Sequence, residues 1–175
     1  MRAVVQRVLS ASVRRGSPEH SHEPANTIQA GLLVLLGIHR DDQSADLEWM
    51  VKKILSLRLF DGEDGTTRWK RSVKEMGMEI LCISQFTLYG KAVKGSKPDF
   101  HDSMAGPESL PMYEEFLSRL GALYLPEKIQ RGFFGEAMEI DAKMNGPVTI
   151  TLDSPPLKGN TPKKPAVPAS GDADE

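Results

Sequence analysis

Two short stretches of this sequence combine residue types that could act on a carbonyl group. The first, Ser-Gln-Phe-Thr at 84–87, closes an apolar run with two hydroxyls, an amide and an aromatic ring. Ser84 and Thr87 are candidate nucleophiles, but a nucleophile needs a base within hydrogen-bonding reach. The best candidates, His39 and His101, are distant in the sequence. Alternatively, Gln85 and the main-chain N–H groups could donate hydrogen bonds to an oxyanion. A third interpretation is purely structural, with the two hydroxyls only satisfying backbone groups at the strand end.

The second stretch is the pair Gly146-Pro147, which precedes the alternating segment 148–152. Proline often occupies the first position of a strand, so the pair has a purely structural interpretation. Cis geometry occurs in only about 5–6% of X–Pro bonds. If this bond is cis, the two carbonyls can point the same way and hold an ammonium group, while rigid backbone closes one side of it. We expect such a wall to sort substrates by chirality, and both stretches to build one site.

The spacing of apolar residues predicts the elements that position these stretches. Period-two alternation or continuous apolar runs predict strands at 2–13, 31–38, 57–60, 79–83, 129–131, 137–143 and 148–152. A first helix, capped by Asp41, Asp42 or Ser44, carries Leu47, Met50, Val51, Ile54 and Leu57. A second helix over 109–123 begins near Pro111 and uses Leu110, Tyr113, Phe116, Leu117 and Leu120. The long loop 90–106 is typical of functional or disordered segments.

Length and composition bound the architecture. With 175 residues and 39% hydrophobic content, the chain fits one domain over 1–154 and a Pro-, Lys- and Asp-rich tail over 155–175 that we expect to be disordered. A single cysteine, Cys82, allows no disulfide, and no apolar run reaches the length of a membrane helix. We therefore expect a cytoplasmic protein without membrane contact. The arginine-rich start also suits a mitochondrial transit peptide, but its alternation favours a strand.

Neither a metal nor a cofactor is expected. His20 and His22 form a ligand-like pair, but no third ligand is near them. The net charge of −2 argues against a nucleic-acid partner, although residues 66–98 carry seven basic and two acidic side chains. A solvated surface is the plain interpretation of such a charge run. Trp69, placed among cations, favours a surface that faces RNA.

The motifs in this order closely resemble the D-aminoacyl-tRNA deacylase family, also called D-tyrosyl-tRNA deacylase, over residues 1–154. Each motif alone is weak, and their combination is specific. The matching segments are Met1–Val8, Gly31–Gly37, Ser84–Tyr89, Lys94–Phe100 and Gly146–Thr149.

The resemblance implies an α+β fold with an antiparallel or mixed, β-barrel-like sheet and two main helices outside. It also implies an enzyme, without cofactor, that hydrolyses the ester between a D-amino acid, or glycine, and the 3′-terminal adenosine of tRNA. L-aminoacyl-tRNA is spared, which provides chiral proofreading in translation. Family members are homodimers whose active site lies at the interface, where the Gly-Pro loop of one subunit enters the Ser-Gln-Phe-Thr site of the other.

Carried over by residue, the resemblance implies that Gly146 and Pro147 bind the α-amino group and exclude L side chains with main-chain atoms. Arg7 helps to hold that loop. Ser84, Gln85 and the backbone at Phe86 surround the scissile ester. Thr87 is either a nucleophile or a bystander to the ribose 2′-OH of the substrate, and the lack of a nearby base favours the ribose. By looser analogy the adenine pocket is lined by Phe134, Gly135 and Met138.

The sequence departs from the family pattern at four places, one of which is the added tail after Ser154. Met144 stands where an asparagine is usual, Lys70 replaces a commoner polar residue, and the loop 14–26 is longer. The residues leave two other functions open. One is an ordinary esterase or peptidase with Thr87 as nucleophile, and the other is a nucleic-acid-binding module without catalysis.

Overall fold

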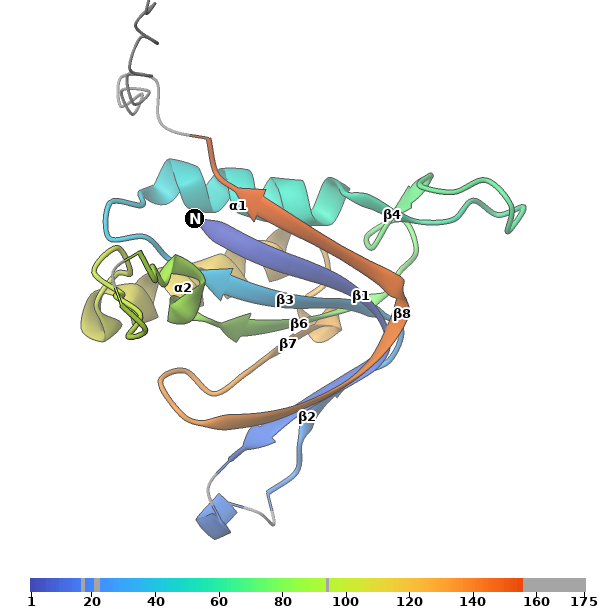
Figure 1. The fold of residues 1–175 in the computed structure, drawn as a ribbon. Helices are drawn as coiled ribbons and strands as arrows, with labels where there is room; N and C mark the ends of the chain where they lie inside the picture. The colour runs from blue at the N-terminus through green and yellow to red at the C-terminus, as the bar shows by residue number, and fades with distance from the viewer. Residues whose placement is uncertain (17, 21–22, 94, 156–175) are drawn as a thin grey trace, which may run out of the picture.

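A strongly curved, mixed sheet of six strands forms the centre of the computed structural model, which describes residues 1–16, 18–20, 23–93 and 95–155 (Figure 1). Its strand order is β2-β1-β3-β6-β7, and β8 pairs with the other side of β1. The strands are β1 (Arg2–Arg15), β2 (Asn26–Ile28), β3 (Gly31–Gly37), β6 (Glu79–Ser84), β7 (Ile129–Arg131) and β8 (Met138–Asp153). The predicted α+β class with a barrel-like mixed sheet is confirmed.

Strand β1 organises the sheet because it has a neighbour along both edges. It runs antiparallel to β3 and β2 on one side and to β8 over its full length on the other. β6 is parallel to β3, and β7 is parallel to β6. Figure 1 shows β1 and β8 bending together, so that the sheet wraps around one side of the molecule.

Two helices cover one face of the sheet. α1 (Ser44–Ser56) and α2 (Gly106–Leu123) pack against the side chains of β1, β3 and β6 that point to this face. The other face of β3 and β6 packs into a second apolar cluster, which explains why β3 is buried on both faces, as predicted. The main core is completed by fully buried residues of the helices: Leu47, Met50, Ile54, Tyr113, Phe116 and Leu120.

The helix starts differ from the predictions. α1 follows Gln43, whose N–H donates to the Asp46 carboxylate at 3.0 Å, so none of the three predicted caps is used. Asp42 instead accepts hydrogen bonds from the His39 N–H and the Met1 amino group.

α2 begins at Gly106, three residues before the predicted start. Pro107 occupies the first turn, where the missing N–H costs nothing, and Pro111 lies inside the helix. Leu110, predicted to face the core, is 38% exposed.

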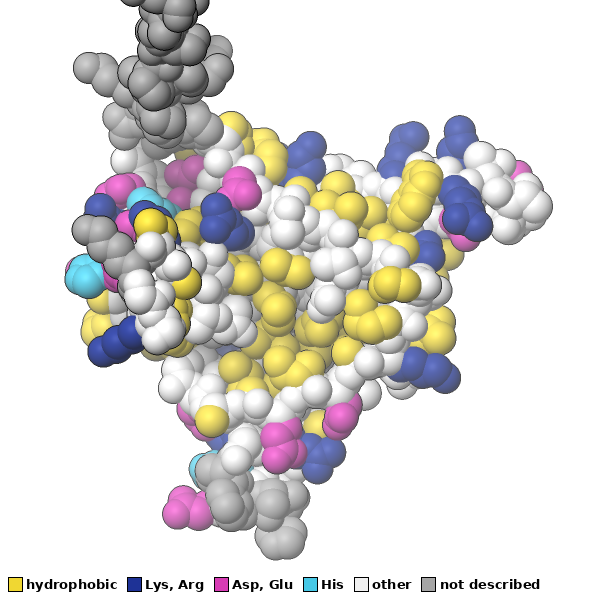
Figure 2. Space-filling view, viewed as in Figure 1, with side chains coloured by type: hydrophobic (Ala, Val, Ile, Leu, Met, Phe, Trp, Pro, Cys, Tyr) yellow, Lys and Arg dark blue, Asp and Glu magenta, His cyan; other side chains and the backbone are white. Residues whose placement is uncertain are grey.

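The second apolar cluster depends on an irregularity in β1. Val5 faces the helices, whereas Ala11, an even number of residues later, faces the second cluster. The register with β8 shifts between Val8 and Ser10, so β1 carries one extra residue there and its alternation changes face. The cluster comprises Val8, Ala11, Val13, Ile28, Leu33, Leu81 and Ile83. Figure 2 shows hydrophobic side chains across the middle of the exposed face of the curved sheet.

The remaining elements are short. β4 (Arg58–Phe60) and β5 (Arg71–Ser72) pair as a separate two-stranded ribbon, which confirms the strand predicted near 57–60. Three 3₁₀ turns follow other strands or loops: η1 (Pro18–His20), η2 (Phe86–Tyr89) and η3 (Pro126–Lys128). In the described part of the chain no helix has the length and apolar character needed to cross a membrane. The predicted tail lies outside the described residues from position 156 onward.

Candidate active site

The Ser-Gln-Phe-Thr segment turns out of the sheet at the end of β6. Ser84 is the last residue of that strand and is level with Leu36 on β3. The next N–H, from Gln85, donates to the Leu36 carbonyl at 2.7 Å, and the chain then enters the turn η2. The side-chain amide of Gln85 donates to the Thr87 hydroxyl. The strand end therefore presents a hydroxyl and an amide from a fixed backbone.

Free backbone donors lie in the same turn. The first N–H groups of any helical turn have no intrahelical acceptor, and those of Phe86 and Thr87 make no hydrogen bond with another described residue. The Phe86 carbonyl accepts a bond from the Ser103 hydroxyl at 2.7 Å, and its ring contacts Phe100 edge to face at 5.1 Å between centroids. Ser103 and Phe100 thus hold the turn in place, and the N–H groups of Phe86 and Thr87 remain available as donors.

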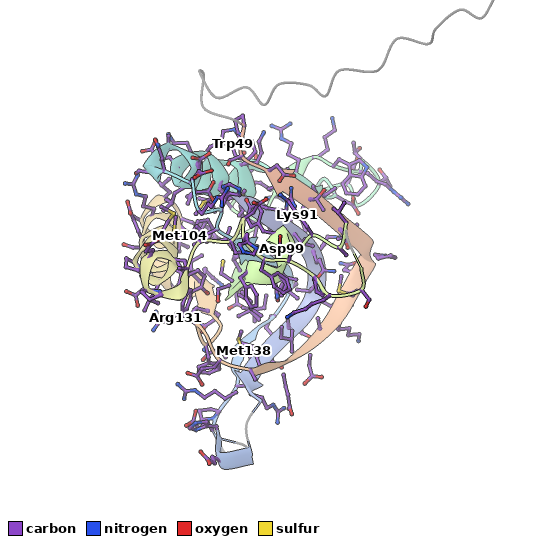
Figure 3. The ribbon with its side chains drawn as sticks, turned by 60° about the vertical axis from the view of Figure 1, so that its left-hand side comes forward. Trp49, Lys91, Asp99, Met104, Arg131 and Met138 are labelled. Carbon is purple, nitrogen blue, oxygen red and sulfur yellow. The ribbon has the colours of Figure 1, made fainter. Side chains whose placement is uncertain are left out.

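A pocket of about 630 Å³ opens beside this turn. Six of the predicted site residues line it together: Ser84, Gln85, Phe86, Phe134, Gly135 and Met138. Its volume falls within the usual range for small-molecule sites. Figure 3 labels Met138 at the start of β8 and Met104 beside α2, two elements that contribute to the lining. The Ser-Gln-Phe-Thr segment at 84–87, called the cradle below, and the segment 134–138 are about fifty residues apart in sequence and share one cavity.

The sequence interpretation missed one wall of this pocket. The wall comes from the end of the long loop and the start of α2, namely Ser103, Met104, Ala105, Gly106 and Ser109. The only signal for it was the length of the loop, which is typical of functional segments but names no residue.

The floor beneath Phe134 is rigid and neutral. The Tyr113 ring lies 5.6 Å from the Phe134 ring, and its hydroxyl donates to the Cys82 carbonyl at 2.9 Å. Burial raises the pKa of Tyr113 well above its ordinary value. The phenol therefore stays protonated at neutral pH and serves as a fixed support.

The Gly146-Pro147 pair lies inside β8, not at the start of a strand as predicted. Pairing with β1 continues on both sides of it, with Gln6 opposite Thr149 and Val8 opposite Met144. Five residue steps on β8 thus correspond to two on β1, so the backbone around the pair loops out of the ladder. The bond between Gly146 and Pro147 is cis, as the chirality hypothesis required, and both residues are exposed.

Arg7, the β1 residue opposite this loop, anchors the residue that precedes the Gly-Pro pair. Its Nε donates to the Asn145 carbonyl at 3.1 Å, and one terminal nitrogen donates to the Leu59 carbonyl of β4 at 2.7 Å. The guanidinium carbon lies 5.9 Å from the centre of the Trp69 ring. The loop is therefore tied to the β4–β5 ribbon through one side chain.

Within one chain the two stretches do not meet. Ser84, Leu36, Ala3 and Leu152 share one level across four strands, whereas the Gly-Pro loop lies beyond Thr149 on β8. Three strand spacings alone amount to roughly 14 Å across the sheet, before the offset along β8 is added. Thr87 and the Gly-Pro pair are also absent from the lining of the pocket. The expected single site is thus incomplete in the single chain.

Neither candidate base forms a hydrogen bond with the hydroxyl of Ser84 or Thr87 in the described part of the chain. The Nδ1 of His39 accepts a hydrogen bond from the Asp41 N–H, and its ring packs on Tyr89. His101 is exposed and interacts with Asp99. Among the described residues no histidine or carboxylate hydrogen-bonds to Ser84 or Thr87. The geometry gives no activated nucleophile.

No metal site is apparent where the chain is described. No group of three His, Cys, Asp or Glu residues there is placed to hold an ion. His22, half of the ligand-like pair, and Lys94, from one family motif, lie outside the described residues.

Comparison with known proteins decides the family. The model of the D-Tyr-tRNA(Tyr) deacylase family matches residues 4–153. The chain belongs to this family. It is 48% identical over 158 residues to a D-aminoacyl-tRNA deacylase of Drosophila melanogaster, covering 90% of this chain and 95% of that protein. A human relative, D-aminoacyl-tRNA deacylase 1, is 46% identical over 155 residues, covering 89% of this chain and 71% of that protein.

Solved structures agree with the family assignment. A structure titled c-Myc DNA Unwinding Element Binding Protein is 46% identical, with a TM-score of 0.81, and covers 89% of this chain and 99% of that one. A second, titled as a probable eukaryotic D-amino acid tRNA deacylase, is only 18% identical with a TM-score of 0.72, which supports the fold alone. The resemblance found in the sequence is confirmed at the level of family and fold.

Proposed function

We propose that this protein hydrolyses the ester of D-aminoacyl-tRNA, releasing the free D-amino acid and tRNA. The observation that carries the proposal is the single pocket in which Ser84, Gln85 and Phe86 face Phe134 and Met138. A strand end with polar donors suits an ester, and an aromatic and thioether wall suits a purine ring. The 3′-terminal adenosine and its acyl group fit these two halves of the pocket.

Hydrolysis of this ester needs stabilisation of a developing oxyanion. The N–H groups of Phe86 and Thr87 and the amide of Gln85 lie at the strand end and are the donors for that charge. The Thr87 hydroxyl accepts a hydrogen bond from Gln85, and among the described residues no base is hydrogen-bonded to it. Because the described part of the chain supplies no base at this position, the vicinal ribose 2′-OH of the substrate assists the attacking water, and the protein holds the substrate in the required orientation.

Discrimination between enantiomers falls to Gly146 and Pro147. A site that accepts many amino acids cannot bind the side chain, so it must recognise the fixed groups on the α-carbon. Main-chain atoms of the loop hold the α-amino group and leave no space where an L side chain would point. Glycyl-tRNA, which has no side chain, passes the same wall.

A second copy of the chain completes the site. Among the described strands β8 pairs only with β1, so a 16-residue strand keeps one open edge beside the apolar face of Figure 2. Long open edges invite pairing with another chain. In a two-fold dimer the exposed Gly-Pro loop of each protomer enters the pocket of its partner. The assembly acts on tRNA in the cytoplasm.

Complementation between two damaged chains tests this arrangement. One chain carries Gln85→Ala in the cradle and the other carries Gly146→Ala in the loop. A heterodimer isolated through two different tags has one site with both halves intact. We expect it to deacylate D-Tyr-tRNA at about half the wild-type rate per dimer, while both parent homodimers are nearly inactive.

The matched control places both substitutions on one chain and pairs it with the wild type. Each shared site then carries one damaged half, so this heterodimer is expected to be inactive. If sites are built within single chains, the outcome is reversed: the control retains half of the activity and the first heterodimer retains none. A protein that is monomeric in gel filtration would also contradict the shared site.

A further inference from the structure

Trp69 is an unusual residue at the mouth of the β4–β5 ribbon. It has a φ of +61°, and it is the only non-glycine residue with positive φ in the described ranges. A bulky side chain in this region is disfavoured by steric contact with its own backbone. Trp69 is nevertheless 49% exposed, so burial of its ring does not explain why the conformation is retained. Such outliers occur at functional sites more often than elsewhere.

The surroundings of Trp69 fix its backbone. The following residue, Lys70, donates its N–H to the Phe60 carbonyl at 2.9 Å, and Arg71 is paired with Phe60 across the ribbon. The indole lies near β1, where the Arg7 guanidinium carbon is 5.9 Å from the ring centre.

The orientation of the Arg7 guanidinium group determines whether it can bind two carbonyls at once. Its two donors bind the carbonyls of Asn145 and Leu59, which belong to different elements, and both bonds lie in the plane of the guanidinium. A ring beside the guanidinium attracts the cation and limits its movement without competing for a hydrogen-bond donor. Trp69 thus lies beside Arg7, a side chain that hydrogen-bonds to both the Gly-Pro loop and the ribbon.

We infer that Trp69 is a positioning residue for the Gly146-Pro147 loop, acting through Arg7, and that it contributes to the discrimination between D- and L-aminoacyl-tRNA. This inference rests on the proposed function. The exposed cations beside the indole, Arg68 and Lys70, favour a different role in which the ring stacks on RNA. The contact with Arg7 favours the positioning role, and the two roles give different kinetics.

The decisive substitution is Trp69→Gly. Glycine adopts the positive φ without strain, so the ring is removed while the backbone is relieved. We expect the melting temperature to hold or rise, and the ratio of kcat/KM for D-Tyr-tRNA to that for L-Tyr-tRNA to fall about two- to fivefold, the size of one half-exposed cation–π contact. The loss should appear in kcat, with KM unchanged. Trp69→Phe restores a ring and should recover most of the ratio.

Trp49 provides a matched control. It also has a cation over its ring, Lys53 at 5.5 Å, but it lies on α1 and packs against the main core (Figure 3). Trp49→Ala is expected to lower the melting temperature and to leave the D/L ratio unchanged. This separates loss of stability from loss of discrimination.

Two outcomes overturn the inference. If Trp69→Gly raises KM equally for both substrates and leaves the ratio unchanged, Trp69 is an RNA contact. If neither KM nor the ratio changes, the indole has no part in the reaction. When the wild type discriminates and the variant does so equally well, only this inference fails. When the wild type itself releases no D-tyrosine, the proposed function fails with it.

Discussion

Gly146 offers the sharpest perturbation of the proposed chirality filter. Its φ of +136° lies in a region that L side chains rarely adopt. A Cβ added there would lie 2.7 Å from the Val148 nitrogen and 2.8 Å from its Cγ2. Gly146→Ala therefore imposes both backbone strain and a clash on the loop.

The size of the effect follows from these distances. The contact with the Val148 nitrogen is about 0.7 Å short of the 3.4 Å at which ordinary contact begins, so the loop must shift by a comparable amount. A displacement of about 1 Å at a reacting group can cost on the order of 100-fold in rate. Backbone strain of about 1–3 kcal/mol lowers the free energy of unfolding by the same amount. In a chain of this size, each kcal/mol lowers Tm by roughly 2–4 °C.

The assay is single-turnover deacylation of D-Tyr-tRNA, with thermal melting of the same samples. Gly77→Ala is the matched control, since Gly77 has a φ of +63° in a remote turn and a Cβ added there would meet nothing within 4 Å. We expect the control to lose some stability and keep its rate. A Gly146→Ala protein that deacylates D-Tyr-tRNA as fast as the control would refute the role given to this loop.

Other contacts give three further predictions. Arg7→Met removes the donor to the Asn145 and Leu59 carbonyls. We expect the free energy of unfolding in urea to fall by about 1–3 kcal/mol and the ratio of kcat/KM for D-Tyr-tRNA to that for L-Tyr-tRNA to decrease. An unchanged ratio would show that Arg7 does not contribute to discrimination. Thr87→Ala should keep most of the single-turnover rate, and a fall to the uncatalysed rate would identify Thr87 as the nucleophile. Burial raises the pKa of the Cys82 thiol to about 12 from an ordinary 9.0. Because the folded state disfavours the thiolate, the free energy of unfolding should decrease as the pH rises from 9 toward 12, and Cys82 should react with an aromatic disulfide reagent at pH 8 only after unfolding.

Much of the fold follows from local patterns in the sequence. β3 is predicted because its run of apolar residues has the length of a strand buried on both faces, and in the structure the helices cover one face and the second cluster covers the other. α1 follows from apolar residues at helical spacing, since Leu47, Met50 and Ile54 must share one face. These are short-range regularities, and tertiary contacts reinforce them.

Errors occur where long-range pairing overrides the local pattern. Gly146-Pro147 interrupts the alternation and predicts a strand end, but β1 pairs on both sides of the loop and keeps β8 continuous. The second helix is a different case, because two prolines compete for its start: Pro111 predicts a later beginning, whereas Pro107 occupies the first turn.

The candidate site is predictable only in part. The Ser-Gln-Phe-Thr segment and the Gly-Pro pair can be named because they occur in order with the other family motifs, although neither is distinctive alone. Their separation by three strand spacings depends on sheet order, which periodicity does not encode. The wall from Ser103 to Ser109 and the contact of Arg7 with Trp69 join segments far apart in sequence, and neither has a local signature.

The most direct test of the proposed function compares the release of tyrosine from D-Tyr-tRNA and from L-Tyr-tRNA by the full-length wild-type protein under identical single-turnover conditions. We predict rapid release of D-tyrosine and far slower release of L-tyrosine, measurable only with a large excess of enzyme. Equal rates for the two enantiomers would contradict the chirality filter, and failure to release D-tyrosine would contradict the proposed hydrolysis.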